Sequence, residues 1–174
     1  MIYLDHAATT PLDPKVLDQM MPYFTHNFGN PSSIHQAGRI AQGGIVSARE
    51  IVSRVLNANP KEIVFTSGGS ESNNLAIKGV ALALAKNDKI GHIITTAIEH
   101  HSVLHTVQSL AKIGFDVTFL PVDGEGFVKI NDLKAALRTN TMLVSIGYAN
   151  NEIGTIQPIA EIGQLCQKRE IFFH

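Results

Sequence analysis

Short apolar runs and amphipathic segments alternate along the chain from residue 91 to residue 173. The apolar runs are rich in β-branched and aromatic residues, which predicts strands, and the amphipathic segments carry apolar residues at helical spacing. Strands are expected over 91–96, 115–122, 142–148 and 171–173, and helices over 100–113, 130–137 and 159–168. This alternation predicts an α/β fold in which helices cover both faces of a largely parallel sheet.

The first 90 residues have a more helical pattern. Pro14 suits the first turn of a helix, and Asp13 before it can act as the N-cap. The predicted helices cover 14–24, 34–57 and 70–86, the predicted strands cover 1–4 and 63–65, and a turn-rich loop covers 27–33.

The sequence EIVFTSGGSESNNLA, at residues 62–76, combines a predicted strand, a glycine turn and the start of a helix. Gly68 and Gly69 leave room for backbone N–H groups to approach an anion, and Ser70 could cap the helix and donate its hydroxyl. The spacing matches neither GxGxxG nor the Walker pattern, so a plain turn with a serine cap is the alternative.

Three polar clusters favour the phosphate site over the plain turn. Residues 67–70, 97–101 and 150–152 all follow predicted strands. Ligands of parallel α/β sheets bind beyond the carboxyl ends of the strands. The three clusters are therefore expected to converge on one site.

Composition narrows the class of protein. The 174 residues are 44% hydrophobic and 17% charged with a formal charge of -1, which is typical of one globular domain. The chain has no basic patch, so nucleic-acid binding is not expected. It has no apolar run long enough to cross a bilayer, so no membrane span is expected. The start of the chain lacks the pattern of a signal peptide and there is one cysteine, so we expect a cytoplasmic protein without an internal disulfide.

Five motifs give the chain a specific resemblance. They are YLDHAATTPLDP at 3–14, GNPSSIH at 29–35, EIVFTSGGSESNNLAIKG at 62–79, IEHHSVL at 98–104 and ANNEIGTIQPI at 149–159. Together they resemble the N-terminal portion of the cysteine desulfurases of the NifS/IscS type, which are class V members of the aminotransferase superfamily. The group that serves iron–sulfur cluster assembly is the most similar.

The resemblance implies a fold, a cofactor and a domain organisation. The family has fold type I of the transferases that depend on pyridoxal 5'-phosphate (PLP), and its members are homodimers. Residues 14–174 would form an incomplete large α/β domain that binds PLP, with a mostly parallel sheet. Residues 1–13 would be an N-terminal segment associated with the small domain.

Family roles carry over to four residues. Gly69 and Ser70 match the positions that hold the cofactor phosphate, where the family has alanine or glycine and then threonine. His100 matches the histidine that stacks on the pyridine ring and serves as an acid or base, and an imidazole suits both tasks. Asn151 matches the asparagine that binds the phenolic oxygen of the cofactor. Without the resemblance, a surface position for His100 and a turn role for Asn151 would be the alternatives.

Other polar residues receive structural or open interpretations. Asn150 and Glu152 are expected to satisfy backbone groups of a turn. His6 stands where the family more often has asparagine, and its role stays open. His101 and His105 share a helix face, but no carboxylate or thiolate completes a ligand set, so no metal site is predicted.

The catalytic set that the resemblance implies is incomplete in this chain. The family's acidic partner of the pyridine nitrogen comes just after the position of His174, followed by the Schiff-base lysine and the nucleophilic cysteine. Cys166 shares an apolar helix side, so we expect a packing residue. Neither Lys78 nor Lys86 is expected in the site. The chain alone is therefore predicted to be inactive, either as a fragment or as half of a split enzyme.

The complete enzyme would convert L-cysteine to L-alanine and transfer the sulfur to an enzyme cysteine as a persulfide. The sulfur would then pass to an iron–sulfur scaffold or a thiolation pathway. A selenocysteine lyase or an aminotransferase of class V is one alternative. A non-catalytic, dimerising chain is the other alternative.

Overall fold

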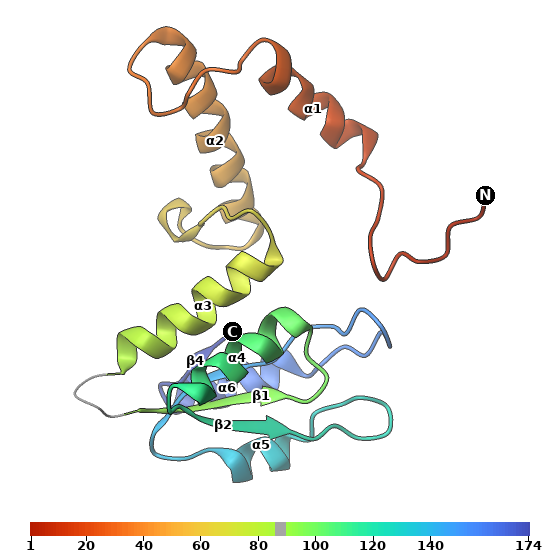
Figure 1. Cartoon of the computed structure of the whole chain (residues 1–174), viewed down its shortest axis with the longest axis vertical. Helices are drawn as coiled ribbons and strands as arrows, with labels where there is room; N and C mark the ends of the chain where they lie inside the picture. The colour runs from red at the N-terminus through yellow and green to blue at the C-terminus, as the bar shows by residue number, and fades with distance from the viewer. Residues whose placement is uncertain (86–89) are drawn as a thin grey trace. The chain divides into compact units, whose positions relative to one another are not determined.

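A four-stranded parallel sheet forms the centre of residues 66–174 in the computed structural model, which describes residues 1–85 and 90–174 (Figure 1). The strands lie in the order β2-β1-β3-β4, and every neighbouring pair is parallel, as predicted. The strands are β1 (His92–Thr96), β2 (Asp116–Leu120), β3 (Thr141–Ser145) and β4 (Phe172–Phe173).

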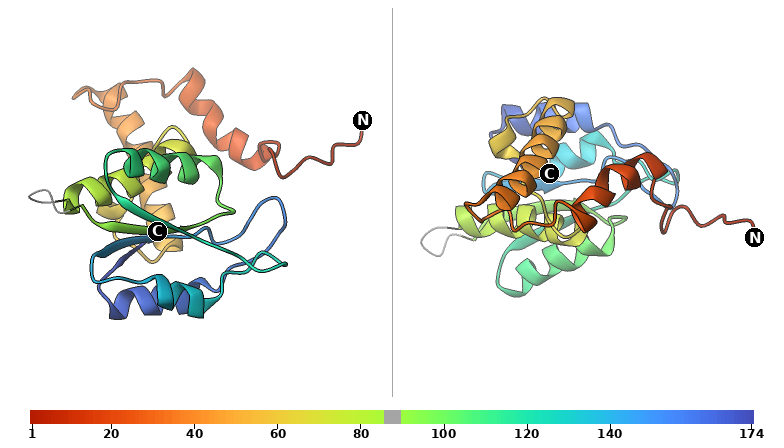
Figure 2. Two further views of the ribbon diagram at one scale, coloured as in Figure 1. Left: turned by 60° about the horizontal axis from the view of Figure 1, so that its bottom comes forward. Right: turned by 90° about the horizontal axis from the view of Figure 1, so that it is seen from above.

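Helices cover both faces of this sheet, which confirms the predicted layers. The left view of Figure 2 shows α3 and α4 on one side of the strands and α5 and α6 on the other. The helices are α3 (Gly69–Leu84), α4 (His101–Lys112), α5 (Ile130–Ala136) and α6 (Ile159–Lys168). The predicted end of α3 at Lys86 lies outside the described residues.

Neighbouring residues of β1 and of β3 face opposite sides of the sheet. Ile93 and Leu143 are buried in the cluster that includes α3 and α4 residues, whereas Ile94 and Val144 are buried in the cluster that includes α5 and α6 residues. Side chains alternate along a strand, so a sheet covered on both faces needs continuous apolar runs. The pattern of the sequence over 91–173 therefore predicted this half of the chain well.

Residues 1–65 form a separate unit of helices and loops. Its elements are α1 (Pro14–Thr25), α2 (Gln36–Val55) and the 3-10 helix η1 (Pro60–Glu62). The Asp13 carboxylate accepts a hydrogen bond from the Lys15 N–H at 2.8 Å, which confirms the predicted cap. The two predicted helices are thus confirmed with small shifts at their ends.

The two strands predicted in this unit are wrong. Residues 1–4 and 63–65 have no regular structure. The Ile63 carbonyl accepts a hydrogen bond from the Arg49 guanidinium, and the Ile63 N–H donates to the Pro60 carbonyl. Local groups thus use the backbone positions that a neighbouring strand would need, and β-propensity alone does not form a strand.

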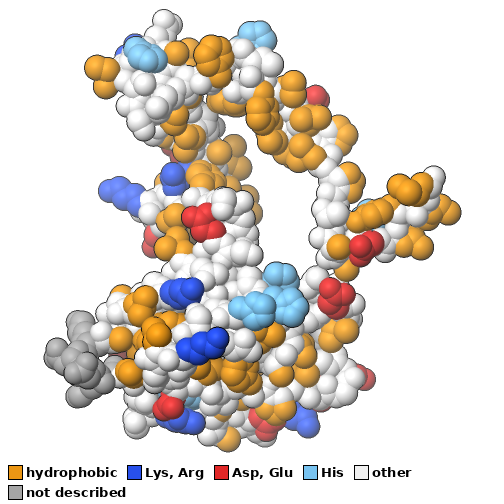
Figure 3. Space-filling model, viewed as in Figure 1, with side chains coloured by type: hydrophobic (Ala, Val, Ile, Leu, Met, Phe, Trp, Pro, Cys, Tyr) orange, Lys and Arg blue, Asp and Glu red, His pale blue; other side chains and the backbone are white. Residues whose placement is uncertain are grey.

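The apolar faces of α1 and α2 are largely exposed. No residue of α1 is buried, and α2 buries only Gly38, Ala41 and Ser53. Figure 3 shows hydrophobic side chains along both helices. Met20, Phe24, Ile40, Ile51 and Val55 have 39% to 79% of their surface exposed. An apolar surface of this extent is typical of a region that packs against further protein.

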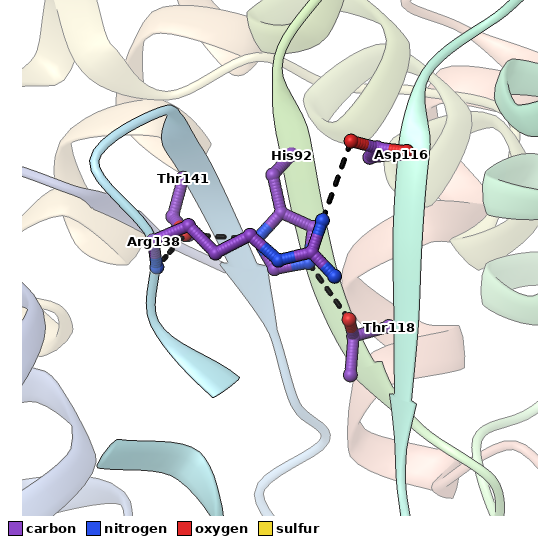
Figure 4. A network of polar contacts seen from close by, with 5 residues as sticks. All are labelled: His92, Asp116, Thr118, Arg138 and Thr141. Atoms are coloured by element: carbon purple, nitrogen blue, oxygen red, sulfur yellow. Dashed lines mark hydrogen bonds and ion pairs between the residues drawn. The ribbon is translucent and has the colours of Figure 1, made fainter. Parts of the chain in front are cut away.

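The buried side chain of His92 connects β1 with β2 and β3. It lies at the end of the sheet opposite to residues 97–101 and 150–152. The His92 ring is fully buried, with Nδ1 at 2.8 Å from Thr141 Oγ1 and Nε2 at 2.8 Å from Thr118 Oγ1 (Figure 4). Thr141 Oγ1 also accepts the Arg138 N–H, which connects the segment before β3 to this network. Burial, followed by the Arg138 charge, lowers the pKa of His92, and Asp116 opposes this shift.

This network predicts a loss of stability in mild acid. Because the folded-state pKa of His92 lies below the unfolded value, its contribution is complete above about pH 6.5 and is lost as the pH falls below that value. The free energy of unfolding should decrease by up to about 1.4 kcal/mol per pH unit from this proton. Urea unfolding followed by circular dichroism at pH 7.5, 6.5 and 5.5 measures the slope.

The comparison variant is His92→Gln, in which no proton binds at this position. Its slope should be smaller than that of the unchanged chain by the part due to His92. The exposed His26→Gln variant is the matched control and should keep the original slope. Equal slopes for His92→Gln and the unchanged chain would contradict this role of the network.

Candidate functional site

A cavity of about 430 Å³ lies beyond the carboxyl ends of β1, β3 and β4. Its walls come from residues 98–100 after β1, residues 146–151 after β3, and Asn73 of α3. Both His100 and Asn151 line this cavity. The structure therefore brings together two of the predicted site residues at the position where parallel α/β sheets bind ligands.

His100 is the N-cap residue of α4, and its ring is held in one orientation. Nδ1 accepts the Ser102 N–H at 3.1 Å and lies 2.8 Å from Ser102 Oγ. Asn73 Nδ2 donates to the same Oγ at 2.7 Å, which leaves the serine proton for Nδ1. Since Nδ1 is an acceptor, the neutral ring carries its proton on Nε2. An exposed imidazole in this form presents its Nε2–H as a hydrogen-bond donor to a group in the cavity.

Glu99 connects the two loops that carry His100 and Asn151. Its Oε1 accepts the Thr96 hydroxyl at 2.8 Å and the Gly147 N–H at 3.0 Å. These bonds tie the end of β1 to the segment after β3. The sequence reasoning missed Glu99 and Asn73, since each acts through a partner that is distant in the sequence.

Asn150 has the structural role that the sequence predicted. Its Oδ1 accepts the N–H groups of Glu152 and Ile153, at 2.9 and 3.1 Å, and its Nδ2 donates to the Ile98 carbonyl at 3.0 Å. These bonds shape the turn and connect it to the β1 side of the cavity. The neighbouring Asn151 is thereby held at the cavity wall, and its Nδ2 lies 3.3 Å from the Glu152 carboxylate.

The structure corrects the predicted cap of α3. Ser70 lies within the helix, the N-cap residue is Gly68, and no side chain of the described residues caps this helix start. A Cβ atom added at Gly68 or Gly69 would meet no other atom within 4 Å. Open space beside uncapped helix N–H groups suits an anion. This geometry fits the phosphate site better than the plain turn.

A carboxylate stabilises the turn before this helix. Glu71 Oε2 accepts both the N–H and the hydroxyl of Ser67 at 2.6 Å. The Ser67 hydroxyl, followed by the Ser67 N–H, lowers the pKa of Glu71. Thr66 Oγ1 lies 2.6 Å from Ser72 Oγ and closes the other side of the turn. The turn is thus held by its own side chains.

The four predicted site residues do not all line one cavity. Ser70 lines a second hollow of about 370 Å³ between α3 and α4, and His100 borders this hollow as well as the first cavity. Gly69 lines neither of these two cavities. Lys78 lines the second hollow and not the first, while Lys86 lies outside the described residues.

Cys166 is a packing residue, as the sequence predicted. Its side chain is 1% exposed and belongs to the core beside α6, and burial raises the pKa of its thiol. A thiol with a raised pKa carries little thiolate, which is the nucleophilic form.

Metal ligands, membrane spans and His6 were also considered in the sequence. Among residues 1–85 and 90–174, no three His, Cys, Asp or Glu side chains are grouped to hold a metal ion. No helix in these ranges is both long and apolar enough to cross a bilayer. His6 packs edge-on against the Tyr3 ring, with ring centroids 5.0 Å apart.

Comparison with known proteins places this arrangement in a family. Residues 2–174 match the family described as aminotransferase class-V. The chain belongs to this family. Its curated relatives include the cysteine desulfurase IscS of Clostridium botulinum at 56% identity and a putative cysteine desulfurase of Bacillus subtilis at 53%. Both matches cover 99% of this chain but only 43% and 45% of the relatives.

Solved structures of family members have the same fold. One, described as SspA in complex with cysteine, has a TM-score of 0.95 and 45% identity, and covers 100% of this chain and 50% of that one. A NifS-like protein has a TM-score of 0.94 and 41% identity, with coverage of 99% and 47%. The predicted fold type I of PLP-dependent transferases is therefore confirmed. The chain spans about half the length of these family members or less.

Proposed function

We propose that this chain is the N-terminal part of a PLP-dependent cysteine desulfurase. The complete enzyme converts L-cysteine to L-alanine and transfers the sulfur to an enzyme cysteine as a persulfide. The observation that carries this proposal is the pairing of His100 and Asn151 on one cavity at the carboxyl ends of the strands. The 56% identity to a cysteine desulfurase supports this substrate class within the family.

The described residues fit PLP. The uncapped start of α3 at Gly69 and Ser70 would hold the phosphate, His100 would lie on the pyridine ring, and the Asn151 amide would bind the phenolic oxygen. When bound, PLP supplies an electron sink for the Cα of an amino acid. The Ser102 contacts occupy His100 Nδ1 and leave the Nε2–H to donate a hydrogen bond in the cavity. Asn73 and Glu99 keep the walls of the cavity in place.

The remaining parts of the enzyme are proposed to come from further polypeptide. The matched relatives are more than twice as long, and the exposed apolar faces of α1 and α2 need a covering surface. That polypeptide supplies the Schiff-base lysine, the acidic partner and the nucleophilic cysteine, as a continuing or separate chain. Residues 1–13 join the small domain, residues 14–174 belong to the large domain, and the assembled enzyme is a homodimer.

The sulfur acceptor and the location complete the proposal. The persulfide passes its sulfur to an iron–sulfur scaffold or to a thiolation pathway, and the enzyme works in the cytoplasm. The identity to cysteine desulfurases with the IscS name supports the sulfur-transfer role over a general aminotransferase. The chain alone has no turnover, because Cys166 is buried and no other cysteine is present.

The test compares the chain alone with the chain joined to its remaining polypeptide. With PLP and L-cysteine, the assembled enzyme should release alanine and, in the presence of a thiol reductant, sulfide in equal amounts. The chain alone should release neither. An assembled enzyme that binds PLP but yields no alanine from L-cysteine would overturn the desulfurase proposal, and sulfide from the chain alone would overturn the proposed division of the catalytic residues.

A further inference from the structure

The second hollow, between α3 and α4, has a regular construction. Two rows of side chains face it, each with the i, i+4, i+8 spacing that places residues along one side of a helix. The first row is Ser70, Asn74 and Lys78 on α3, and the second row is His101, His105 and Ser109 on α4. We call this feature the α3–α4 groove.

The lining of the α3–α4 groove is rich in hydrogen-bond donors and contains no carboxylate. Lys78 contributes a permanent positive charge. The His101 and His105 rings stack with centroids 5.2 Å apart and an interplanar angle of 27°, and both side chains are exposed. Figure 3 shows histidine side chains gathered at the surface over the start of α4. The groove therefore offers an ammonium group and two imidazoles to one ligand.

Several neighbouring polar groups are already used within the helices. The Ser109 hydroxyl donates to the Thr106 carbonyl at 2.7 Å, and Asn74 Nδ2 donates to the Ser70 carbonyl at 2.9 Å. The groups left for a ligand are thus dominated by Lys78, His101 and His105. Such a set favours an oxyanion, because ammonium and imidazole N–H groups form strong charge-assisted hydrogen bonds with phosphate oxygens.

A metal ion fits this groove less well. Two histidines four residues apart could chelate a metal, but a protein site usually has at least three ligands. The described residues contain no third His, Cys, Asp or Glu in a suitable group. The Lys78 ammonium would in addition repel a cation. Charge and ligand count therefore both favour an anion.

We propose that the α3–α4 groove binds an oxyanion, such as the phosphate group of a small phosphorylated molecule, through Lys78, His101 and His105. The groove shares Ser70 and His100 with the proposed cofactor site, whereas Lys78, His101 and His105 do not line the cavity that contains Asn151. His100 borders both, so an anion in the groove lies next to the residue proposed to act on the cofactor ring.

The test is a titration of the purified chain with inorganic pyrophosphate, followed by NMR. The imidazole signals of His101 and His105 should shift together and saturate. Lys78→Gln should weaken this binding about tenfold or more, because one charge-assisted contact is lost. Lys112→Gln removes the same charge from α4 outside the groove and should leave the affinity within about twofold. The exposed His105→Gln variant gives a second test if Lys78→Gln does not fold.

The same spectra separate this proposal from the cofactor phosphate site. The Gly69 amide signal reports binding at the start of α3, and the His105 ring reports binding in the groove. Pyrophosphate shifts of Gly69 without shifts of His105 would overturn the groove proposal and leave the cofactor site intact. Equal weakening by Lys78→Gln and Lys112→Gln would overturn it as general charge attraction. Zinc binding at His101 and His105 without pyrophosphate binding would assign the groove to a cation.

Discussion

Replacing His100 by alanine in the complete enzyme should lower the turnover of L-cysteine by about 10²- to 10⁴-fold, the range for loss of a positioned acid or base. The ring is held by Ser102, and its Nε2–H is the proton that it presents to the cavity. Alanine removes this proton donor while the uncapped start of α3 and Asn151 remain. PLP affinity should therefore fall less than turnover does.

The measurements are steady-state alanine formation and the equilibrium affinity for PLP, both on the assembled enzyme. Ser102→Ala should have a smaller effect than His100→Ala, because the Ser102 N–H still donates to His100 Nδ1. Gln108→Ala, at an exposed position of α4, is the matched control and should behave as the unchanged enzyme. Unchanged turnover in His100→Ala would refute the proposed role, and an equal loss of PLP affinity and turnover would reduce that role to cofactor binding.

The sheet and its helices could be predicted because both depend on local patterns. Ile93 and Ile94 are adjacent in sequence and serve opposite faces, so the apolar run that predicts β1 is also the run that a doubly covered strand requires. The start of α1 was predicted for a similar reason, since Asp13 and Pro14 act within one turn. These elements could be predicted because residues close together in the sequence determine them.

The wrong predictions concern strands that lack a partner strand and the exact start of a helix. The run at 63–65 has strand propensity, but a strand forms only beside another strand, and Arg49 and Pro60 bind Ile63 instead. Ser70 has the side chain of a cap, yet the helix begins one residue before it. Helix ends shift by one or two residues with small changes in backbone geometry.

The candidate site was predicted in part by strand ends and in part by resemblance. The predicted strand ends indicated that residues 67–70, 97–101 and 150–152 would meet. Residues of the last two ranges line one cavity, whereas residues 67–70 do not line it. Glu99 was not predicted, because its role depends on the Gly147 N–H across the sheet. The spacing of residues along the sequence does not indicate that Glu99 and Gly147 form a hydrogen bond.

Ile162→Ala should destabilise the sheet unit by about 2 to 5 kcal/mol, the range for removing a large buried aliphatic side chain. Ile162 is fully buried in the cluster that includes Ile94, Val144 and Cys166. The loss of stability has two parts, the lost burial of apolar surface and the cavity that the smaller side chain leaves. The cavity remains because the closely packed sheet and helix relax only partly around it. α6 would lose one of its two buried side chains in this cluster.

Urea unfolding followed by far-ultraviolet circular dichroism measures this change, because the chain has no tryptophan for fluorescence. Ile162→Val removes one methyl group and should cost about 0.5 to 1.5 kcal/mol. Gln167→Ala, at an exposed position of the same helix, should stay within about 0.5 kcal/mol of the unchanged chain. Equal stabilities of Ile162→Ala and Gln167→Ala would mean that α6 is not packed on the sheet in solution, and the β4 side of the cavity would then lose its support.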